Sequence, residues 1–363
     1  MFTFCSEIEN RRLRLEQRKK PTLASVKLFK RSGFDLTMAA STNVEETELT
    51  AKECQNRIDQ FVLVTQTDEA QAQELLQDHD WKVDLAVNAY FASTAPEDVV
   101  ITTKPPSSLS VITWNIDGLD EKNAERRITY VIQEIRKIKP DVVLLQEVID
   151  AFVEVFERQL VDYHVIEQGG GGAYFTCTLI RKTTVYLDDV KSKSFSNSKM
   201  GRAMQIVHAH IGQVKLSFIN VHLESTKEFS KQRTEQLEQC VQEMVTARKE
   251  ITVICGGDFN IRDSEVASLR GGQGLPPNIK DVWEELGKRK DVQYTWDCLR
   301  NTNLQMPGKF KPRMRFDRVL VKEAENIQTF KPKSFNLIGI EKVPGCQSFA
   351  SDHWGILVCF QLN

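Results

Sequence analysis

The chain has 363 residues, of which 41% are hydrophobic and 27% charged, an ordinary globular composition that leaves room for one large domain or two unequal ones. Its formal net charge of −2 excludes a global basic field for nucleic acid, so phosphate binding must depend on a local patch. No apolar stretch approaches the ~20 residues of a membrane span, and the N-terminus lacks the apolar region of a signal peptide.

The eight cysteines are scattered without a C-x-x-C pair, and several lie in apolar runs such as "TVICGG". We therefore expect buried, reduced thiols rather than a disulfide framework or a zinc site. Reduced thiols indicate the nucleus or the cytoplasm. The basic segment "RRLRLEQRKK", residues 11–20, fits a nuclear import signal, and a solvated helical face is the alternative.

Residues 1–50 are polar and of mixed charge, which predicts a disordered or weakly ordered tail. In residues 51–93, helical apolar spacing recurs in three short stretches and predicts a small three-helix bundle. The last stretch, "DWKVDLAVNAYF", resembles the final helix of ubiquitin-associated domains. That family's short Met-Gly-Phe-type loop is replaced here by "VTQT", so a docking bundle without ubiquitin affinity is the alternative.

Residues 94–108, rich in Pro and Ser, form the predicted linker. In residues 109–363, the predicted catalytic domain, strand and helix patterns alternate, as is typical of an α/β fold. Apolar residues recur at helical spacing in "AERRITYVIQEIRKIK" and "KEFSKQRTEQLEQCVQEMVTARK", which predicts two amphipathic helices.

Polar side chains gather where the predicted strands of this domain end or begin. These residues are Asn115, Asp117, Glu147, His222, Glu224, Asp258, Asn260, Asp317, Asp352 and His353. Three pairs, 115/117, 222/224 and 258/260, are two residues apart, which places both side chains on one face of an extended strand. Each group alone is commonly a turn former, but together they can bind a hard cation, move protons and hold phosphate oxygens.

Each type of side chain indicates a role in hydrolysis of a phosphate ester. Mg²⁺ typically takes only one or two protein carboxylates, so we predict Glu147 as its ligand and Asp117 as a second, direct or through water, with Mn²⁺ as the alternative ion. Asp258 can activate water as a general base, and Asp317 can orient a histidine. The groups predicted to donate to phosphate oxygens or to orient the water are Asn115, Asn260, His222 and His353.

The motifs "TWNIDGLD", "LQEV", "HLES", "GGDFNIRD", "RFDR" and "SDHW" occur in this order between residues 113 and 354. They resemble the endonuclease/exonuclease/phosphatase superfamily. The resemblance implies a two-sheet α/β sandwich whose site lies where the strands of both sheets end. Within it, "TWNIDGLD", "HLES" and "SDHWG" are most similar to the 5′-tyrosyl-DNA phosphodiesterases, which release a topoisomerase II tyrosine from a DNA 5′ phosphate. The helical domain that precedes the catalytic domain is also similar to the architecture of that family.

The resemblance implies Mg²⁺-dependent cleavage of 5′-phosphotyrosyl DNA in repair of double-strand breaks. It makes Asp258 the proton donor and acceptor, and Glu147 and Asp117 the metal carboxylates. The single-stranded DNA 5′ end is expected to contact Asn115, Ile116, Asp117, Gly118, Leu119, His222, Leu223, Glu224, Ser225, Thr226, Lys227, Asn260, Ile261 and Arg262. The path of the terminal nucleotides is expected along Tyr174, Trp296, Phe316 and His353, with Arg202 as a further phosphate ligand.

The sequence itself is compatible with that substrate. Trp296 and Phe316 are candidate stacking platforms, with a place in the core as the alternative. The run "GKFKPRMRFDR", residues 308–318, interleaves basic and aromatic residues and predicts DNA contact. Ser225 in "STKE" is an N-cap of the following helix, an anion ligand, or both. The rival functions are an abasic-site endonuclease or deadenylase of the same superfamily, or a ubiquitin-binding adaptor.

Overall fold

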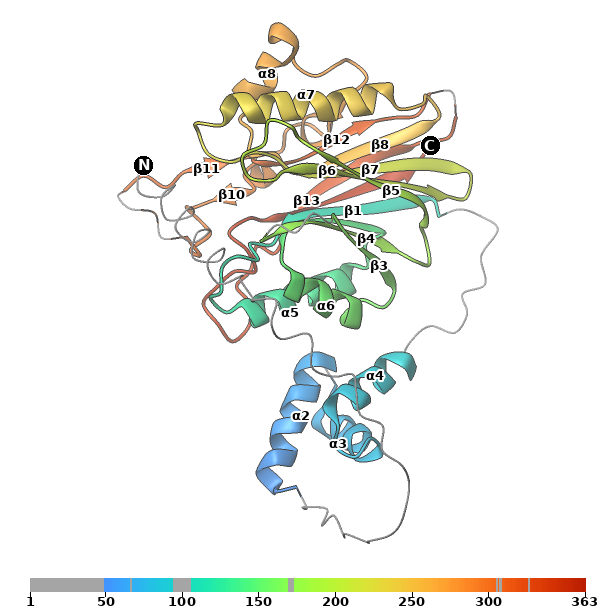
Figure 1. The fold of residues 1–363 in the computed structure, drawn as a ribbon, viewed down its shortest axis with the longest axis vertical. Coiled ribbons are helices and arrows are strands. Elements are labelled where there is room, and N and C mark those ends of the chain that lie inside the picture. Colours follow the sequence, from blue (N-terminus) through green and yellow to red (C-terminus); the bar gives the residue numbers. More distant parts are fainter. Residues whose placement is uncertain are drawn as a thin grey trace, which may run out of the picture. The chain divides into compact units, whose positions relative to one another are not determined.

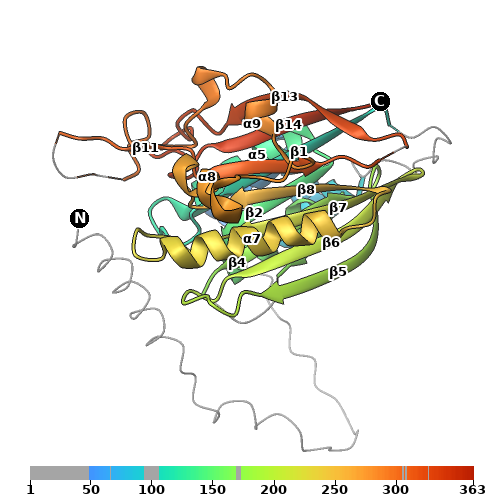
Figure 2. The ribbon, with the colours of Figure 1, turned by 90° about the horizontal axis from the view of Figure 1, so that it is seen from above.

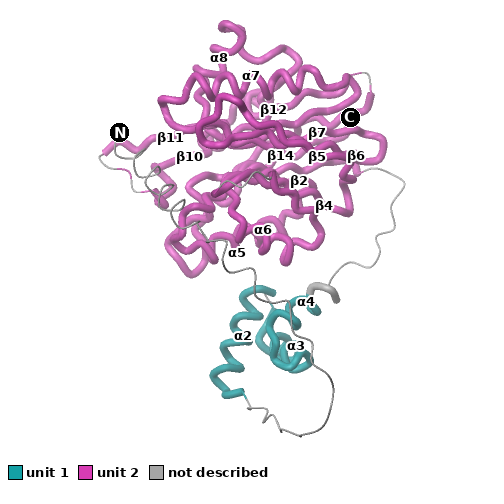
Figure 3. Tube along the Cα trace, viewed as in Figure 1, with its two compact units in different colours: residues 1–95 teal, residues 96–363 magenta. Residues whose placement is uncertain are grey.

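The computed structural model describes residues 49–65, 67–93, 106–168, 173–304, 306, 309–325 and 327–363. Most of the predicted tail and linker, and the glycine run at 169–172, lie outside these described residues. The chain divides into two compact units, residues 1–95 and 96–363 (Figure 3). Among the described helices, none combines the length and apolar character that crossing a membrane requires.

The first unit contains three helices, α2 (Ala51–Thr65), α3 (Glu69–Asp78) and α4 (Val83–Ser93). Their small core is formed by Ile58, Phe61, Ala72, Leu76 and Ala86. This arrangement confirms the predicted three-helix bundle, and its few buried side chains fit a module near the lower size limit for independent folding.

The second unit contains two six-stranded sheets. The first sheet has the order β13-β14-β1-β2-β4-β3 and the second the order β5-β6-β7-β8-β12-β9. The strands of the first sheet are β1 (Ser108–Asn115), β2 (Val142–Val148), β3 (Tyr163–Glu167), β4 (Phe175–Arg181), β13 (Phe330–Ile338) and β14 (Gly355–Leu362). Those of the second are β5 (Tyr186–Ser194), β6 (Ala203–Ile211), β7 (Val214–His222), β8 (Ile251–Asp258), β9 (Lys280–Asp281) and β12 (Asp317–Lys322).

The two sheets pack face to face, and helices cover their outer faces (Figure 1). Helices α5 (Ala124–Ile138) and α6 (Asp150–Gln159) lie on the first sheet. Helices α7 (Ser230–Thr246) and α8 (Asp263–Gly272) lie on the second, and Figure 2 shows α7 running along its strands. This architecture confirms the predicted two-sheet α/β sandwich. The shorter elements are α9 (Val282–Glu285), a 3-10 turn (Lys290–Val292) and a hairpin of β10 (Trp296–Asp297) and β11 (Arg313–Met314).

Two parallel crossovers, β1–α5–β2 and β7–α7–β8, bring polar strand ends to one place. In the register of the second sheet, Asp258 lies opposite His222 on one side and Asp317 on the other. Because β7 and β8 are parallel, their carboxyl ends meet at the same edge of the sheet. The fold therefore gathers groups that are far apart along the chain.

The predicted N-cap of the long amphipathic helix α7 is wrong. Helix α7 begins at Ser230, and Phe229 occupies its N-cap position without a side-chain cap. Ser225 is therefore not the N-cap of this helix, and its hydroxyl instead lies 3.1 Å from the sulfur of Met200. The prediction of unpaired thiols is confirmed for the described cysteines, all of which are free.

Candidate active site

Three side chains from separate elements converge on one carboxylate oxygen. Asp258 ends β8 and is only 1% exposed. Its Oδ2 lies 3.1 Å from Nδ2 of Asn115, 3.4 Å from Nε2 of His222 and 3.7 Å from Nε2 of His353. These groups come from the end of β1, the end of β7 and the segment before β14. Asp258 is therefore the centre of the candidate site.

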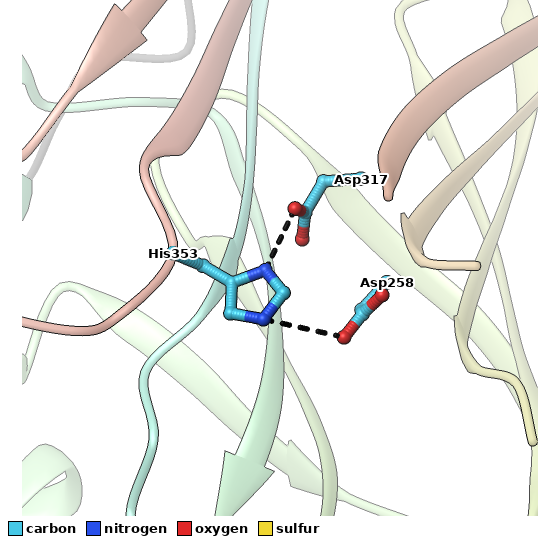
Figure 4. Close-up of side chains that lie close together, drawn as sticks. All are labelled: Asp258, Asp317 and His353. Atoms are coloured by element: carbon cyan, nitrogen blue, oxygen red, sulfur yellow. Dashed lines mark hydrogen bonds and ion pairs between the residues drawn. The ribbon is translucent and has the colours of Figure 1, made fainter. Parts of the chain in front are cut away.

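His353 bridges two buried carboxylates (Figure 4). Its Nδ1 lies 2.8 Å from Oδ2 of Asp317, and its Nε2 faces Asp258. Burial lowers the pKa of His353, but the charges of Asp317, Asp352 and Asp258 outweigh it and hold that pKa well above its ordinary value. The three groups lie close enough to share a cation, but each ring nitrogen of His353 already faces a carboxylate oxygen, Nδ1 at 2.8 Å and Nε2 at 3.7 Å. The arrangement fits a proton relay better than a metal site.

The pKa of Asp258 is raised to about 7, mainly because the carboxylate is buried and also because of the charge of Asp317. The charge of His353 and the amide of Asn115 act in the opposite direction. The backbone N–H of Asn260 donates to Oδ1 of Asp258 over 2.9 Å, which fixes the carboxylate. A group whose pKa lies near neutral pH is suited to act as a general base.

Asn115 links Asp258 to the first sheet. Its Oδ1 accepts the backbone N–H of Asp117 at 3.0 Å, so its Nδ2 faces the acids. That nitrogen donates to Oε1 of Glu147 at 3.0 Å as well as to Asp258. Asp117, Glu147 and Asn260 all have positive φ, a left-handed conformation that costs about 1–3 kcal/mol in such residues. The surrounding structure therefore holds these polar groups in strained positions.

The acids beside Asn115 fit a divalent cation. The pKa of Asp117 is well above its ordinary value because of burial and the negative charges of Asp352 and Glu147. Burial and the charge of Asp352 likewise raise the pKa of Glu147. A cation would relieve this mutual repulsion, and oxygen donors suit Mg²⁺ and Mn²⁺. Glu147 and Asp117, the predicted ligands, are half-buried and keep access to solvent.

Asp352 is one of the polar residues beside a predicted strand, but the sequence predicts no role for it, and the structure places it in the site. Its negative charge helps to raise the pKa of both predicted metal ligands, Asp117 and Glu147. Its Oδ2 accepts the indole N–H of Trp296 at 3.1 Å. The available signal was the motif "SDHW" itself, in which Asp352 directly precedes His353.

Arg202 determines the tautomer of His222. Its Nη1 lies 2.9 Å from Nδ1 of His222, and a guanidinium can only donate, so the ring proton resides on Nε2. Burial and the charges of Arg202 and His353 hold the pKa of His222 well below its ordinary value. The neutral ring presents Nε2–H to Asp258 and to Glu147, whose Oε1 is 3.8 Å away. The ring of Tyr174 packs against His222 with 6.0 Å between centroids.

The predicted aromatic path lies beside this cluster. Trp296 and Phe316 are half-buried, with ring centroids 5.6 Å apart and planes tilted by 42°. Among the other residues predicted to contact DNA, Lys227 is exposed. Those that are half-buried are Asp117, Leu119, Tyr174, Ser225, Thr226, Asn260 and Arg262.

Several residues of the predicted DNA-contact segments turn away from the site. Ile116, Leu223 and Ile261 are buried in apolar clusters, so their side chains do not face the site. The carboxylate of Glu224, fully buried, accepts hydrogen bonds from the hydroxyl of Ser198 and from the backbone N–H of Lys199. Glu224 thus holds the segment that leads to Arg202 rather than facing solvent. Gly118 packs so closely on the first sheet that an added Cβ would lie 2.2 Å from the carbonyl oxygen of Glu147.

The prediction that the basic run at 308–318 contacts DNA is wrong for two of its arginines. Arg315 and Arg318 are buried, and both pair with Asp281 and Asp263 at 2.6–3.0 Å. Their charges are neutralised inside the protein, because a buried guanidinium requires a partner. Phe310, at the tip of the same run, is 80% exposed.

Comparisons with known proteins agree with this geometry. The model of the Endonuclease/Exonuclease/phosphatase family matches residues 112–353, and a UBA-like domain model matches residues 55–97. Tyrosyl-DNA phosphodiesterase 2 of Gallus gallus is 37% identical over 336 residues, covering 84% of this chain and 89% of the relative. The Homo sapiens protein of the same name is 35% identical over 332 residues, covering 82% of this chain and 90% of the relative.

A solved structure gives the same result. The crystal structure of D. rerio TDP2 complexed with single strand DNA product has a TM-score of 0.67 and 38% identity, covering 70% of this chain and all of the other. The curated relatives cover both units of this chain, and the matched family model spans every strand end that builds the site. The chain therefore belongs to the tyrosyl-DNA phosphodiesterase 2 family, within the endonuclease/exonuclease/phosphatase superfamily.

Proposed function

We propose that this protein is a metal-dependent 5′-tyrosyl-DNA phosphodiesterase. It hydrolyses the bond between a topoisomerase II tyrosine and a DNA 5′ phosphate, and leaves a 5′ phosphate in repair of double-strand breaks. The observation that carries the proposal is the convergence of Asn115, His222 and His353 on Oδ2 of Asp258. The relatives that share the fold over most of the chain carry the name of this activity.

Glu147 and Asp117 are the residues that would hold Mg²⁺, with Mn²⁺ as the alternative. When bound, such a cation supplies Lewis-acid polarisation of a phosphoryl oxygen. Asp258 accepts a proton from the attacking water, because its pKa of about 7 leaves a large ionised fraction at neutral pH. The imidazolium of His353, held by Asp317, and the Nε2–H of His222 donate to phosphate oxygens as charge develops. Asn115 and Asn260 orient the carboxylates.

The single-stranded 5′ end follows the aromatic side chains beside the site. Trp296, Phe316 and Tyr174 offer ring faces to bases, and stacking of this kind is worth ~1–3 kcal/mol per base. Arg202 and Arg262 supply positive charge for phosphates, and the D. rerio complex with a single-strand DNA product supports this type of ligand.

The decisive experiment is a substrate panel. Wild-type protein is assayed side by side on a 5′-tyrosyl oligonucleotide, an abasic duplex and poly(A), with Mg²⁺ or Mn²⁺. We expect preference for the tyrosyl substrate and its loss in Glu147→Gln. A preference for the abasic duplex or for poly(A) would replace this function by one of the two rival nuclease activities.

Residues 51–93 form a UBA-like domain and residues 109–363 the catalytic domain, with ubiquitin or ubiquitinated proteins as the partner of the first. Leu85 of α4 is 51% exposed and offers an apolar contact. The test is a titration of the full chain with ubiquitin, in which Leu85→Asp should abolish binding without altering cleavage. The site of action is the nucleus, with the cytoplasm as a second location, and fluorescence microscopy of the tagged full chain checks this.

A further inference from the structure

A buried arginine on α5 joins two segments that carry acids of the site. Arg127 is 2% exposed and lies in the first turn of the helix that follows β1. Its guanidinium donates to the carbonyl oxygens of Ile116, Asp117, Asp120 and Lys122, all in the segment between β1 and α5. It also donates to the carbonyl oxygen of Ala350 at 2.9 Å. One side chain therefore ties this segment to Ala350, which lies 223 residues after Arg127.

Both tied segments hold functional groups. The first carries Asp117, a proposed metal ligand, and Ala350 lies two residues before Asp352 and three before His353. A second link supports the same junction, since the hydroxyl of Ser351 donates to the carbonyl oxygen of Asn115 at 2.6 Å. The positions of the acids relative to one another thus depend on contacts beneath them.

The chemistry of the side chain suits this task. A guanidinium presents five donors in a rigid plane, whereas an ammonium is a point charge that cannot bridge several carbonyls in one plane. The hydrogen bonds of Arg127 go to backbone oxygens, and a carboxylate oxygen of Asp117 lies 3.9 Å from its Nη1, at the outer limit of an ion pair. Its positive charge therefore also lies beneath the acidic cluster.

We propose that Arg127 is a positioning residue that locks the Ile116–Lys122 segment to the Ala350–His353 segment, and so sets the spacing of Asp117, Asp352 and His353. It touches neither substrate nor reacting atoms. The proposal rests on the proposed phosphodiesterase function for its catalytic consequence, but the locking itself can be measured without substrate.

The first test is hydrogen–deuterium exchange of the full chain, comparing wild type, Arg127→Lys and the matched control Arg233→Lys. Arg233 is a fully buried arginine of α7 that donates to the carbonyls of Glu224 and Thr226. We expect Arg127→Lys to lose protection in both residues 116–122 and residues 350–353, and Arg233→Lys to lose it in residues 224–227 but in neither of those two segments. Unchanged protection of residues 350–353 in Arg127→Lys would overturn the proposal.

The second test separates positioning from charge. The thermal midpoint of each variant is titrated with Mn²⁺ in the absence of DNA, and kcat and KM are measured on the tyrosyl substrate. Positioning predicts that Arg127→Lys and Arg127→Met both weaken the apparent metal affinity and kcat by roughly 10–100-fold, as loss of residues that support metal ligands usually does. KM should change little. If Arg127 acted only as a nearby positive charge, Arg127→Met would bind Mn²⁺ more tightly than wild type, and that result would also overturn the proposal.

The outcomes for the two proposals are distinguishable. If the wild-type protein cleaves none of the three nucleic-acid substrates, the proposed function is wrong. The hydrogen–deuterium exchange of the Arg127 and Arg233 variants still decides the role of Arg127. If Arg127→Met does not fold, Arg127→Lys, which keeps the charge and most of the volume, supplies the comparison.

Discussion

In both parallel crossovers of the second unit, a buried arginine of the helix supports the loop that leaves the first strand. The two crossovers differ in how the charge of that arginine is neutralised. In β1–α5–β2 and β7–α7–β8, the loop that leaves the first strand contains a residue with positive φ, Asp117 or Thr226. In each, a buried arginine of the helix, Arg127 or Arg233, donates to the carbonyl oxygens of that loop. Arg127 therefore has the same place in the first crossover as Arg233 has in the second.

The difference lies in how each arginine is neutralised. Nη2 of Arg233 lies 2.6 Å from Oε1 of Glu265, a direct ion pair. Burial raises the pKa of Glu265, but the hydrogen bonds from Ser230 and Arg233 outweigh burial and hold that pKa below its ordinary value. Arg127 instead meets mainly carbonyls, with Asp117 at 3.9 Å. The arginine of the second crossover is neutralised by a carboxylate of α8, whereas the arginine of the first leaves the nearby carboxylate of Asp117 without a close ion pair.

The largest effect is expected at the group where both crossovers meet. Asp258 receives Asn115 from the first and His222 from the second. The Asp258→Asn variant cannot accept a proton from water, so we expect kcat on the tyrosyl substrate to fall by ~10²–10⁴-fold. Single-turnover cleavage with saturating metal measures this. If Asp258→Asn retained more than about a tenth of the wild-type rate, well above the loss expected of a general base, Asp258 would be removed from its role.

The second effect concerns stability rather than catalysis. Arg233→Met leaves the Glu265 carboxylate without its partner, and breaking such a buried pair costs ~3–5 kcal/mol. We expect a value near the lower limit, because the Glu265 side chain keeps 12% of its exposure. Urea denaturation measures the change, and the double variant Arg233→Met/Glu265→Met should recover part of it. If the double variant recovers none of the lost free energy of unfolding, the Arg233–Glu265 ion pair is not the cause of the destabilisation.

The third effect concerns the close packing of Gly118, in the loop after β1, against the backbone of Glu147 on β2. A Cβ at position 118 would lie 2.2 Å from the carbonyl oxygen of Glu147, so Gly118→Ala must displace one of the two segments. A displacement of about 1 Å in an active site can cost ~10²-fold in rate, which is the loss expected here. Rate measurements on Gly118→Ala and Gly118→Ser should agree, because both add the same Cβ. Wild-type activity in either variant would contradict the close approach.

The smallest effect is a pH-dependent stability change. The folded-state pKa of Asp258 is about 7, above its ordinary value of 3.8, so its contribution to stability is complete below pH ~4 and is lost as pH rises through about 7. Asp258→Asn has no such loss. Without metal, its thermal midpoint relative to wild type should therefore rise by a few degrees between pH ~5 and pH ~8. Equal differences at both pH values would mean that the carboxylate ionises normally in the folded protein.

Much of the site could be predicted because residue type and strand position are local properties. Asn115, Glu147, Asp258 and His353 follow or precede apolar runs, and their motifs occur in a recognisable order. The apolar spacing at positions 128, 131, 132, 135 and 138 likewise predicted the inner face of α5, where the first four side chains are buried and Ile138 is half-buried. These features need no knowledge of distant contacts.

Other residues gave misleading local signals. Glu224 alternates with His222 and appeared to share its face, but β7 ends at His222, and the chain then turns its carboxylate inward. Arg315 and Arg318 read as a basic surface beside aromatic residues, although Asp263 and Asp281 bury them in ion pairs. In each case the partner is supplied by a different element.

The amino-acid sequence by itself determined the fold class, the three-helix module and the chemical types that meet at the site. Only the tertiary structure decided which charged groups are internal supports and which converge on the candidate site. The physical reason is that hydrophobic periodicity repeats within a few residues, whereas a charge can be buried only where distant partners compensate it. Arg127 shows this most clearly, since its acceptors include a carbonyl 223 positions away.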